Sequence, residues 1–309
     1  MSASAAVFAY HDVGVRCLGV LLARGLRVPL VVTHRDDARE NVWFASVERF
    51  AREHDLPVET PEDPNDAGFV ARLSALAPDF LFSFYYRQML SPAVLATARR
   101  GAFNMHGSLL PRYRGRAPVN WAVLRGERET GATLHEMTAR PDAGRIAGRM
   151  AVPILPDDQA LDVFRKVTVA AELVLDRALA GLVDGSLALE PQDLAAGSYF
   201  GGRRPEDGRI DWSRPAVEVH NLVRAVAPPY PGAFTPFRGG TLRVLRSRVL
   251  AGRRTRPGAA TLGVAGEALE AACADGGVLR LLAIDFDGLA LDAAGFAARF
   301  GAGPHPLGN

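Results

Sequence analysis

Two short apolar stretches decide the fold, Phe80-Leu81-Phe82-Ser83-Phe84-Tyr85 and Ala102-Phe103-Asn104-Met105-His106. Short apolar runs rich in aromatic and β-forming residues are typical of buried strands. Between them, residues 92–99 have apolar residues at helical spacing. A strand, a helix and a second strand in this order favour parallel pairing in a sheet that helices cover.

The same alternation extends toward the N-terminus. Further strands are predicted at Ala5–Tyr10, Val28–Thr33 and Leu56–Glu59, and helices at Val15–Leu26, Val42–His54 and Ala67–Leu76. Strands and helices that alternate on this period predict an α/β protein with a Rossmann-like parallel sheet and helices on both faces.

The texture of the chain changes in its second half. A long helix is predicted at Asp158–Gly185, followed by a crossing loop rich in Gly, Arg and Asp at Gly197–Asp211. Short β-rich runs then follow between Gly and Pro turns, at Thr241–Leu250, Ala259–Val264, Ala268–Ala272 and Val278–Asp285. Such runs predict a small barrel or sandwich, so we expect two domains, 1–203 and 204–309.

Composition is that of a soluble globular protein. The 309 residues are 48% hydrophobic and 23% charged, with a net charge of +2. No run of about 18 apolar residues predicts a membrane span, and no basic residue precedes the first apolar run as in a signal peptide. We therefore expect a cytoplasmic protein with no membrane insertion. The two cysteines, Cys17 and Cys273, lack metal-ligand spacing, and no metal is expected.

The predicted strand at residues 102–106 ends in Asn104 and His106. Residues two apart in a strand face the same side, so one face carries an amide and an imidazole. Ligands bind beyond the carboxyl ends of strands in open parallel sheets. These two groups could stabilise a developing oxyanion and exchange a proton at neutral pH. Taken alone, an N-x-H pair is more often a structural pair of buried side chains that hydrogen-bond to the backbone.

A second polar element is the turn Arg140-Pro141-Asp142-Ala143-Gly144. Asp followed by a small residue and Gly suits a turn without further function. If the turn lies beside His106, its carboxylate would raise the pKa of the histidine.

The order N-x-H-G-S-L-L-P-x-x-R-G from Asn104 to Gly115, followed by the D-A-G of residues 142–144, resembles the 10-formyltetrahydrofolate-dependent formyltransferases. Within that family the resemblance is greatest to the formyltransferase domain of ArnA, a bifunctional polymyxin-resistance enzyme that formylates UDP-4-amino-4-deoxy-L-arabinose. Resembling stretches run along nearly the whole chain, among them residues 8–12, 82–87, 114–121, 129–135 and 223–226.

The resemblance implies roles for individual residues. Asn104 would stabilise the transition state, His106 would donate or accept the proton, and Asp142 would raise the pKa of His106. It also implies an OB-like C-terminal domain and 10-formyltetrahydrofolate as the formyl donor. The implied folate site is lined by Gln88, Met89, Leu90, Arg116, Thr138, Ala139, Arg140, Pro141 and Asp142.

The acceptor is less well defined by the sequence. Candidate substrate contacts are Tyr86, Arg87, Ser108, Arg204 and Arg224, with Arg203 as a further candidate for a diphosphate. A nucleotide amino sugar, lipid A modification and polymyxin resistance are implied by the resemblance. The chain ends at Asn309, which leaves no room for the decarboxylase half of ArnA. A separate protein would then supply that step, or the sugar differs.

Three alternatives remain. Methionyl-tRNA formyltransferase uses the same chemistry, but residues 204–309 hold 13 Arg against 10 Asp and Glu, and the segment 34–40 is short and of mixed charge. Since nucleic-acid binding requires a denser basic surface, we expect small-molecule partners only. Another nucleotide-linked amino sugar is the second alternative, and a non-catalytic folate- or nucleotide-binding module is the third. No G-x-G-x-x-G follows the first strand, so NAD is not expected.

Overall fold

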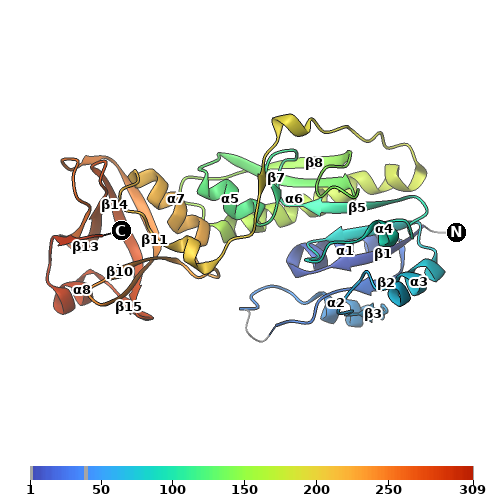
Figure 1. Ribbon diagram of the computed structural model, residues 1–309, viewed down its shortest axis with the longest axis horizontal. Helices are drawn as coiled ribbons and strands as arrows, with labels where there is room; N and C mark the ends of the chain where they lie inside the picture. Colours follow the sequence, from blue (N-terminus) through green and yellow to red (C-terminus); the bar gives the residue numbers. More distant parts are fainter. Residues whose placement is uncertain (1–2, 38–40, 309) are drawn as a thin grey trace. The chain divides into compact units, whose positions relative to one another are not determined.

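The computed structural model describes residues 3–37 and 41–308 (Figure 1). The chain divides into two compact units, which are described separately. The first comprises residues 1–118, 129–152 and 164–201, and the second comprises residues 119–128, 153–163 and 202–309. The predicted domain boundary near residue 203 remains a prediction. The two units differ from the predicted domains in that two short segments before residue 203 group with the second unit. Residues 38–40 of the segment 34–40 lie outside the described residues.

The first unit is built on a seven-stranded sheet of order β3-β2-β1-β4-β5-β7-β8. Pairings among β1 to β5 are parallel, as predicted. The order reverses between β1 and β4, which is where open α/β sheets bind ligands. The strands are β1 (Ser4–Ala9), β2 (Arg27–Val32), β3 (Val58–Glu59), β4 (Phe80–Phe84), β5 (Gly101–His106), β7 (Glu129–Glu136) and β8 (Ile146–Pro153).

The α/β fold class is confirmed, and the sheet is mixed where we expected only parallel pairing. Strand β7 pairs antiparallel with β5, and neither β7 nor β8 was predicted. A separate two-stranded sheet joins β6 (Arg114–Gly115) to β9 (Tyr199–Phe200) in parallel. This pairing orders part of the predicted crossing loop 197–211.

Six α-helices are described in or partly in the first unit, and their bounds differ from the predicted ones where local caps intervene. They are α1 (His11–Ala23), α2 (Val47–Glu53), α3 (Ala67–Leu76), α4 (Pro92–Leu95), α5 (Pro118–Leu124) and α6 (Ala160–Asp184). Helices α5 and α6 also contribute residues to the second unit. Two ion pairs, Arg16–Glu172 and Arg24–Asp176, join α1 to α6.

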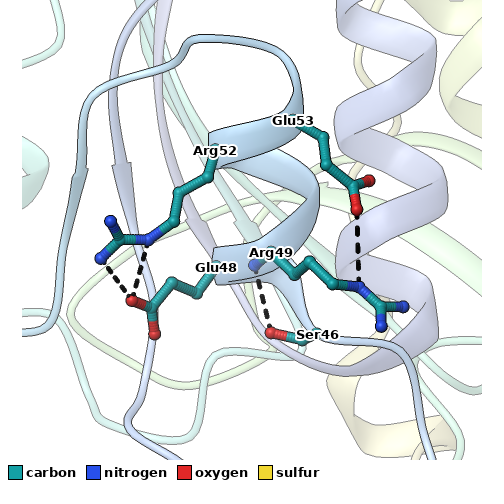
Figure 2. A pocket seen from close by; sticks show the side chains of 5 residues that line it. All are labelled: Ser46, Glu48, Arg49, Arg52 and Glu53. Carbon is teal, nitrogen blue, oxygen red and sulfur yellow. Dashed lines mark hydrogen bonds and ion pairs between the residues drawn. The ribbon is translucent and has the colours of Figure 1, made fainter.

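Helix α2 begins five residues later than predicted. The Ser46 side chain accepts a hydrogen bond from the Arg49 N–H at 3.2 Å and caps the helix there (Figure 2). The preceding Trp43 and Phe44 instead pack their rings against His11. The hollow beside α2 is lined by Ser46, which accepts from the Arg49 backbone N–H, and by two side-chain ion pairs, Glu48 with Arg52 and Arg49 with Glu53.

Helix α1 starts four residues earlier than predicted and helix α4 ends four residues earlier. Gly14 lies inside α1, where an added Cβ would come within 2.9 Å of a Val47 methyl group. It therefore permits close packing of α1 against the start of α2. After α4, the Arg99 N–H donates to the Pro78 carbonyl, which leads the chain into β5.

The second unit contains a mostly antiparallel β-sheet of order β10-β11-β14-β13-β12-β16, with β15 paired to β14. Its strands are β10 (Ala233–Phe237), β11 (Gly240–Arg254), β12 (Thr261–Ala265), β13 (Ala268–Ala272), β14 (Gly277–Phe286), β15 (Leu289–Leu291) and β16 (His305–Pro306). Helices α7 (Ala216–Val226) and α8 (Ala293–Phe300) and the 3-10 turn Pro205–Gly208 also belong to this unit. The two helices were not predicted. The predicted β-rich second domain is confirmed as an antiparallel half-barrel.

No helix in the described part of the chain is both long enough and apolar enough to cross a membrane.

Candidate active site

Strand β5 presents Asn104 and His106, and β7 brings His135 opposite Asn104. In the antiparallel register of these strands, Asn104 pairs directly with His135 and His106 with Thr133. Directly opposed residues in an antiparallel pair have neighbouring side chains. The Asn104 Nδ2 atom lies 3.2 Å from His135 Nε2. The amide and a second imidazole are therefore in contact at this strand end.

His106 is held by the loop that follows β5. Its Nε2 lies 2.8 Å from the Tyr113 carbonyl oxygen. Because a carbonyl only accepts hydrogen bonds, Nε2 carries the proton. In the neutral ring Nδ1 then bears the lone pair, and it lies 3.6 Å from Asp142 Oδ1. The ring is buried, so solvent does not compete for either nitrogen.

Asp142 is brought to the histidine by a constrained turn. Its φ of 50° lies in the left-handed region, which Asp tolerates better than most residues. The Gly115 N–H donates to Asp142 Oδ2 at 2.9 Å, and the Gln192 side chain donates to the Asp142 carbonyl at 3.2 Å. The structure thus places the turn beside His106, which the sequence alone did not establish.

The glycine of the D-A-G turn is required by close packing. A Cβ on Gly144 would lie 1.9 Å from the Glu136 carbonyl oxygen. Gly107 is constrained in the same way, because a Cβ there would lie 2.0 Å from the Tyr85 hydroxyl oxygen. Both glycines let neighbouring segments approach the catalytic candidates.

His135 completes the cluster and was not predicted as a site residue. Its Nδ1 donates to the Glu136 carbonyl at 2.8 Å, which leaves Nε2 as the acceptor for the Asn104 amide. His135 Nε2 also lies 3.5 Å from Asp142 Oδ1. Only the β5–β7 register places this histidine, because its own sequence neighbourhood gives no reason to choose it over other histidines.

Burial and neighbouring groups together set the pKa values of His106 and Asp142. Burial lowers the pKa of His106, and this effect outweighs Asp142 and the Tyr113 carbonyl, which act to raise it. The carboxylate thus acts in the expected direction, but the net shift is downward and the neutral imidazole is favoured. Burial also acts to raise the pKa of Asp142, yet His106, His135 and the Gly115 N–H hold it well below its ordinary value.

The residues of the predicted folate site fall on two surface segments of the first unit. Met89 has a side chain that is 60% exposed, whereas Leu90 packs against the core. Gln88 is bonded to the Tyr86 hydroxyl and the Glu62 carbonyl. The second segment is the turn 138–142, in which residues 138–140 are exposed and Pro141 and Asp142 are partly buried. The Thr138 hydroxyl donates to the Arg140 carbonyl, and Ala139 belongs to the same turn. Arg116 is exposed, and its N–H donates to Phe200.

Several predicted substrate contacts are already committed to the protein. Ser108 is fully buried and donates to the Arg112 carbonyl at 2.6 Å. Tyr86 is buried, with its ring stacked on His34, and burial raises its pKa to about 12. Arg224 is buried in α7 and donates to Asn221 and to the Leu155 and Asp158 carbonyls.

The remaining predicted contacts are closer to solvent. Arg87 is exposed and lies over the Tyr10 ring, and Arg204 is exposed at the start of the 3-10 turn. Arg203 is half-buried over the Trp121 ring at 4.8 Å. Among residues 3–37 and 41–308, no group of three or more His, Cys, Asp or Glu side chains is arranged to hold a metal ion.

The chain thus has a mixed α/β unit, which carries an amide, an imidazole and a carboxylate at one strand end. An antiparallel β unit follows it. Residues 24–179 match the family described as formyl transferase, and residues 203–301 match its C-terminal domain. The chain belongs to the formyl transferase family. The formyltransferase class predicted from the sequence is confirmed.

Solved structures share this fold at low sequence identity. An N-formyltransferase from Helicobacter canadensis, in complex with folinic acid and dTDP-3-aminofucose, is 19% identical with a TM-score of 0.72, over 91% of this chain and 99% of its own. WlaRD, a sugar 3N-formyl transferase solved with dTDP and 5-N-formyl-THF, is 18% identical with a TM-score of 0.71, over 91% and 97%. HypX from Aquifex aeolicus, in complex with tetrahydrofolic acid, is 19% identical with a TM-score of 0.64, over 96% of this chain and 47% of its own.

Proposed function

We propose that this protein transfers the formyl group of 10-formyltetrahydrofolate to the primary amine of a nucleotide-linked amino sugar. One observation carries the proposal: Asn104, His135, Asp142 and His106 form a continuous cluster at the end of β5, in which both histidines are buried. Such a cluster can hold an oxyanion and move a proton, which are the two demands of acyl transfer.

In the first step, the attack of the amine, His106 acts as the base. Its lowered pKa favours the neutral ring at pH 7, with the lone pair on Nδ1. As the amine attacks the formyl carbon, Nδ1 accepts a proton from the amine nitrogen. The imidazolium that forms is next to the Asp142 carboxylate, whose own pKa is held low enough to keep it charged. Asp142 therefore stabilises the protonated state only once it is needed.

In the same step, Asn104 acts as the oxyanion donor. Attack converts the formyl carbonyl oxygen to an oxyanion on a tetrahedral carbon. One amide hydrogen of Asn104 is directed to His135, and the other is left to donate to that oxygen. Because His135 fixes the amide plane, the donor is oriented before the reaction, and loss of such a donor typically costs about 3–4 kcal/mol.

Collapse of the intermediate completes the transfer. The bond from the formyl carbon to folate N10 breaks, its electron pair goes to N10, and His106 returns the proton there. The products are tetrahydrofolate and the N-formyl sugar, and His106 is neutral again. The exposed Met89 and the turn 138–142 are proposed to face the folate, since an exposed apolar side chain suits a planar ring.

Two observations support a nucleotide amino sugar as the acceptor. The sequence resembles the ArnA formyltransferase domain, and two structures of similar fold were solved with dTDP or a dTDP-amino sugar. We therefore take UDP-4-amino-4-deoxy-L-arabinose, with a role in lipid A modification, as the first acceptor to test. The partners proposed are small molecules, and the proposed location is the cytoplasm.

A panel of acceptors tests this function. Purified protein is incubated with 10-formyltetrahydrofolate and, in turn, UDP-4-amino-4-deoxy-L-arabinose, dTDP-3-amino sugars and initiator methionyl-tRNA. Release of tetrahydrofolate is expected only with a nucleotide amino sugar. Faster turnover with the tRNA than with every sugar would overturn the sugar assignment, and turnover with a dTDP sugar alone would correct the nucleotide.

A further inference from the structure

Arg114 is a buried cation in the loop that holds the catalytic candidates. Its residue exposure is only 7%, and it lies in β6, eight residues after His106 in the sequence. The residue before it supplies the carbonyl that fixes His106, and the residue after it supplies the N–H that fixes Asp142. Arg114 is therefore tied by its backbone to both reacting groups.

Among residues 3–37 and 41–308, the guanidinium of Arg114 has no protein partner. In the part of the chain that the structure describes, no hydrogen bond or ion pair joins its side chain to another residue, and its enclosed Nε atom is unsatisfied. Other buried charges of this protein are compensated. Glu270 accepts from Arg253 and Arg280, and Arg224 is bonded to an amide and two carbonyls.

An uncompensated buried charge is costly, and folded proteins rarely retain one. Folding alone gives no reason for Arg114 at this position, since a polar or apolar side chain would be cheaper to bury. A cation kept without a partner near a reaction centre indicates that its counter-ion arrives with a ligand. The guanidinium fork matches the paired oxygens of phosphate or carboxylate.

We infer that Arg114 binds the diphosphate of the acceptor nucleotide; this inference rests on the proposed function. In a nucleotide amino sugar, one sugar ring separates the reacting amine from the diphosphate. A cation adjacent in the chain to the groups that hold His106 and Asp142 suits an anion this near to the amine. The carboxylates of folate lie beyond the aminobenzoyl ring and end in a flexible, hydrated glutamyl tail, which a buried cation suits less well.

The test compares Arg114→Gln with Arg112→Gln, its matched control. Arg112 lies in the same loop but is exposed. Binding of UDP, dTDP and folinic acid is measured by calorimetry, and steady-state kinetics are measured for the acceptor. Arg114→Gln is expected to weaken UDP or dTDP binding and raise the acceptor KM by roughly 10- to 100-fold. Folinic acid binding and the behaviour of Arg112→Gln are expected to match the wild type.

A second variant covers the case in which Arg114→Gln does not fold. Arg114→Lys keeps the charge but loses the fork, so its nucleotide affinity is expected to fall by a smaller factor. Weakened folinic acid binding with unchanged nucleotide binding would overturn the inference, as would unchanged binding of all three ligands. Failure of the proposed function is recognised separately, because the wild-type protein would then bind neither UDP nor dTDP.

Discussion

At the residue scale, the proposed direction of proton transfer depends on the protonation state of His106. A neutral ring that donates through Nε2 to Tyr113 offers its other nitrogen as a base. Burial lowers the pKa of His106, and the nearby Asp142 carboxylate only partly offsets that effect. We therefore propose that the Asp142 carboxylate mainly stabilises the protonated His106 that forms during the reaction, and not the neutral His106 of the resting enzyme.

The pH dependence of kcat tests this assignment. A histidine whose pKa is lowered stays neutral to a lower pH, so activity is present above that pKa and lost as pH falls through it. We expect the acid limb of kcat below the ordinary histidine value of about 6.5. In Asp142→Asn, which loses the group that raises the histidine pKa, kcat falls and the limb moves further toward acid. A limb above 6.5 in the wild type would contradict the neutral base.

Asn104 and His135 are predicted to contribute unequally. Asn104→Ala removes the oxyanion donor, and kcat is expected to fall by about 100- to 1,000-fold with little change in KM. His135→Ala removes only the bond that orients the amide, so a loss of up to about tenfold is expected. His135→Gln, whose side-chain oxygen can accept from Asn104, is expected to recover part of kcat. Equal losses of kcat in Asn104→Ala and His135→Ala would contradict the assignment of Asn104 as the donor and of His135 as the residue that only orients it.

At the scale of elements, the sequence predicts only part of the site. Some site residues are placed by local sequence patterns, and others are placed by contacts between segments far apart in the chain. Local patterns predict β1, β4 and β5 closely, and with them the shared face of Asn104 and His106. The strand β7 was missed because Glu129–Glu136 mixes Thr, Gly, His and Glu with few apolar residues. Its strand conformation depends on antiparallel pairing with β5, a long-range contact that periodicity does not encode.

The contacts of several individual residues also depend on segments far away in the sequence, so the sequence alone did not predict them. The resemblance supplied Asp142, but the turn that places it is held by Gly115 and Gln192, far apart in sequence. Arg224 was a candidate for the diphosphate because of its charge, although its bonds to backbone carbonyls follow only from packing. Arg114 was not chosen, since burial without a partner is visible only in three dimensions.

The close packing of the D-A-G turn gives a prediction at this scale. In Gly144→Ala the added methyl group collides with the Glu136 carbonyl, so the turn and Asp142 must shift. We expect a loss of about 1–3 kcal/mol in the free energy of unfolding and a lower kcat. Gly201→Ala is the control, because an added Cβ there meets nothing within 4 Å. Chemical denaturation and turnover of both variants are compared; an unaffected Gly144→Ala would show that the turn is free to adapt.

At the scale of the whole molecule, the cluster at β5 bears on the reaction, and the charge of the second unit bears on the kind of acceptor. The cluster of Asn104, His106, His135 and Asp142 lies entirely in the first unit, and we propose that it carries out the reaction. Residues 204–309, which belong to the second unit, hold only 13 Arg against 10 Asp and Glu. Several of these arginines are paired, as Arg243 is with Asp285 and Arg253 with Glu270. This charge pattern favours a small acceptor over a nucleic acid.

The most direct test of the central claim follows a labelled formyl group in a single turnover. Wild-type protein, His106→Ala and the control His54→Ala, an exposed histidine on another surface, are each mixed with carbon-13 formyl-labelled 10-formyltetrahydrofolate and a nucleotide amino sugar. Mass spectrometry then locates the label. The cluster at β5 predicts transfer to the sugar amine in the wild type and His54→Ala, with transfer in His106→Ala slowed by at least about 100-fold. Transfer at equal rates in all three proteins would contradict it.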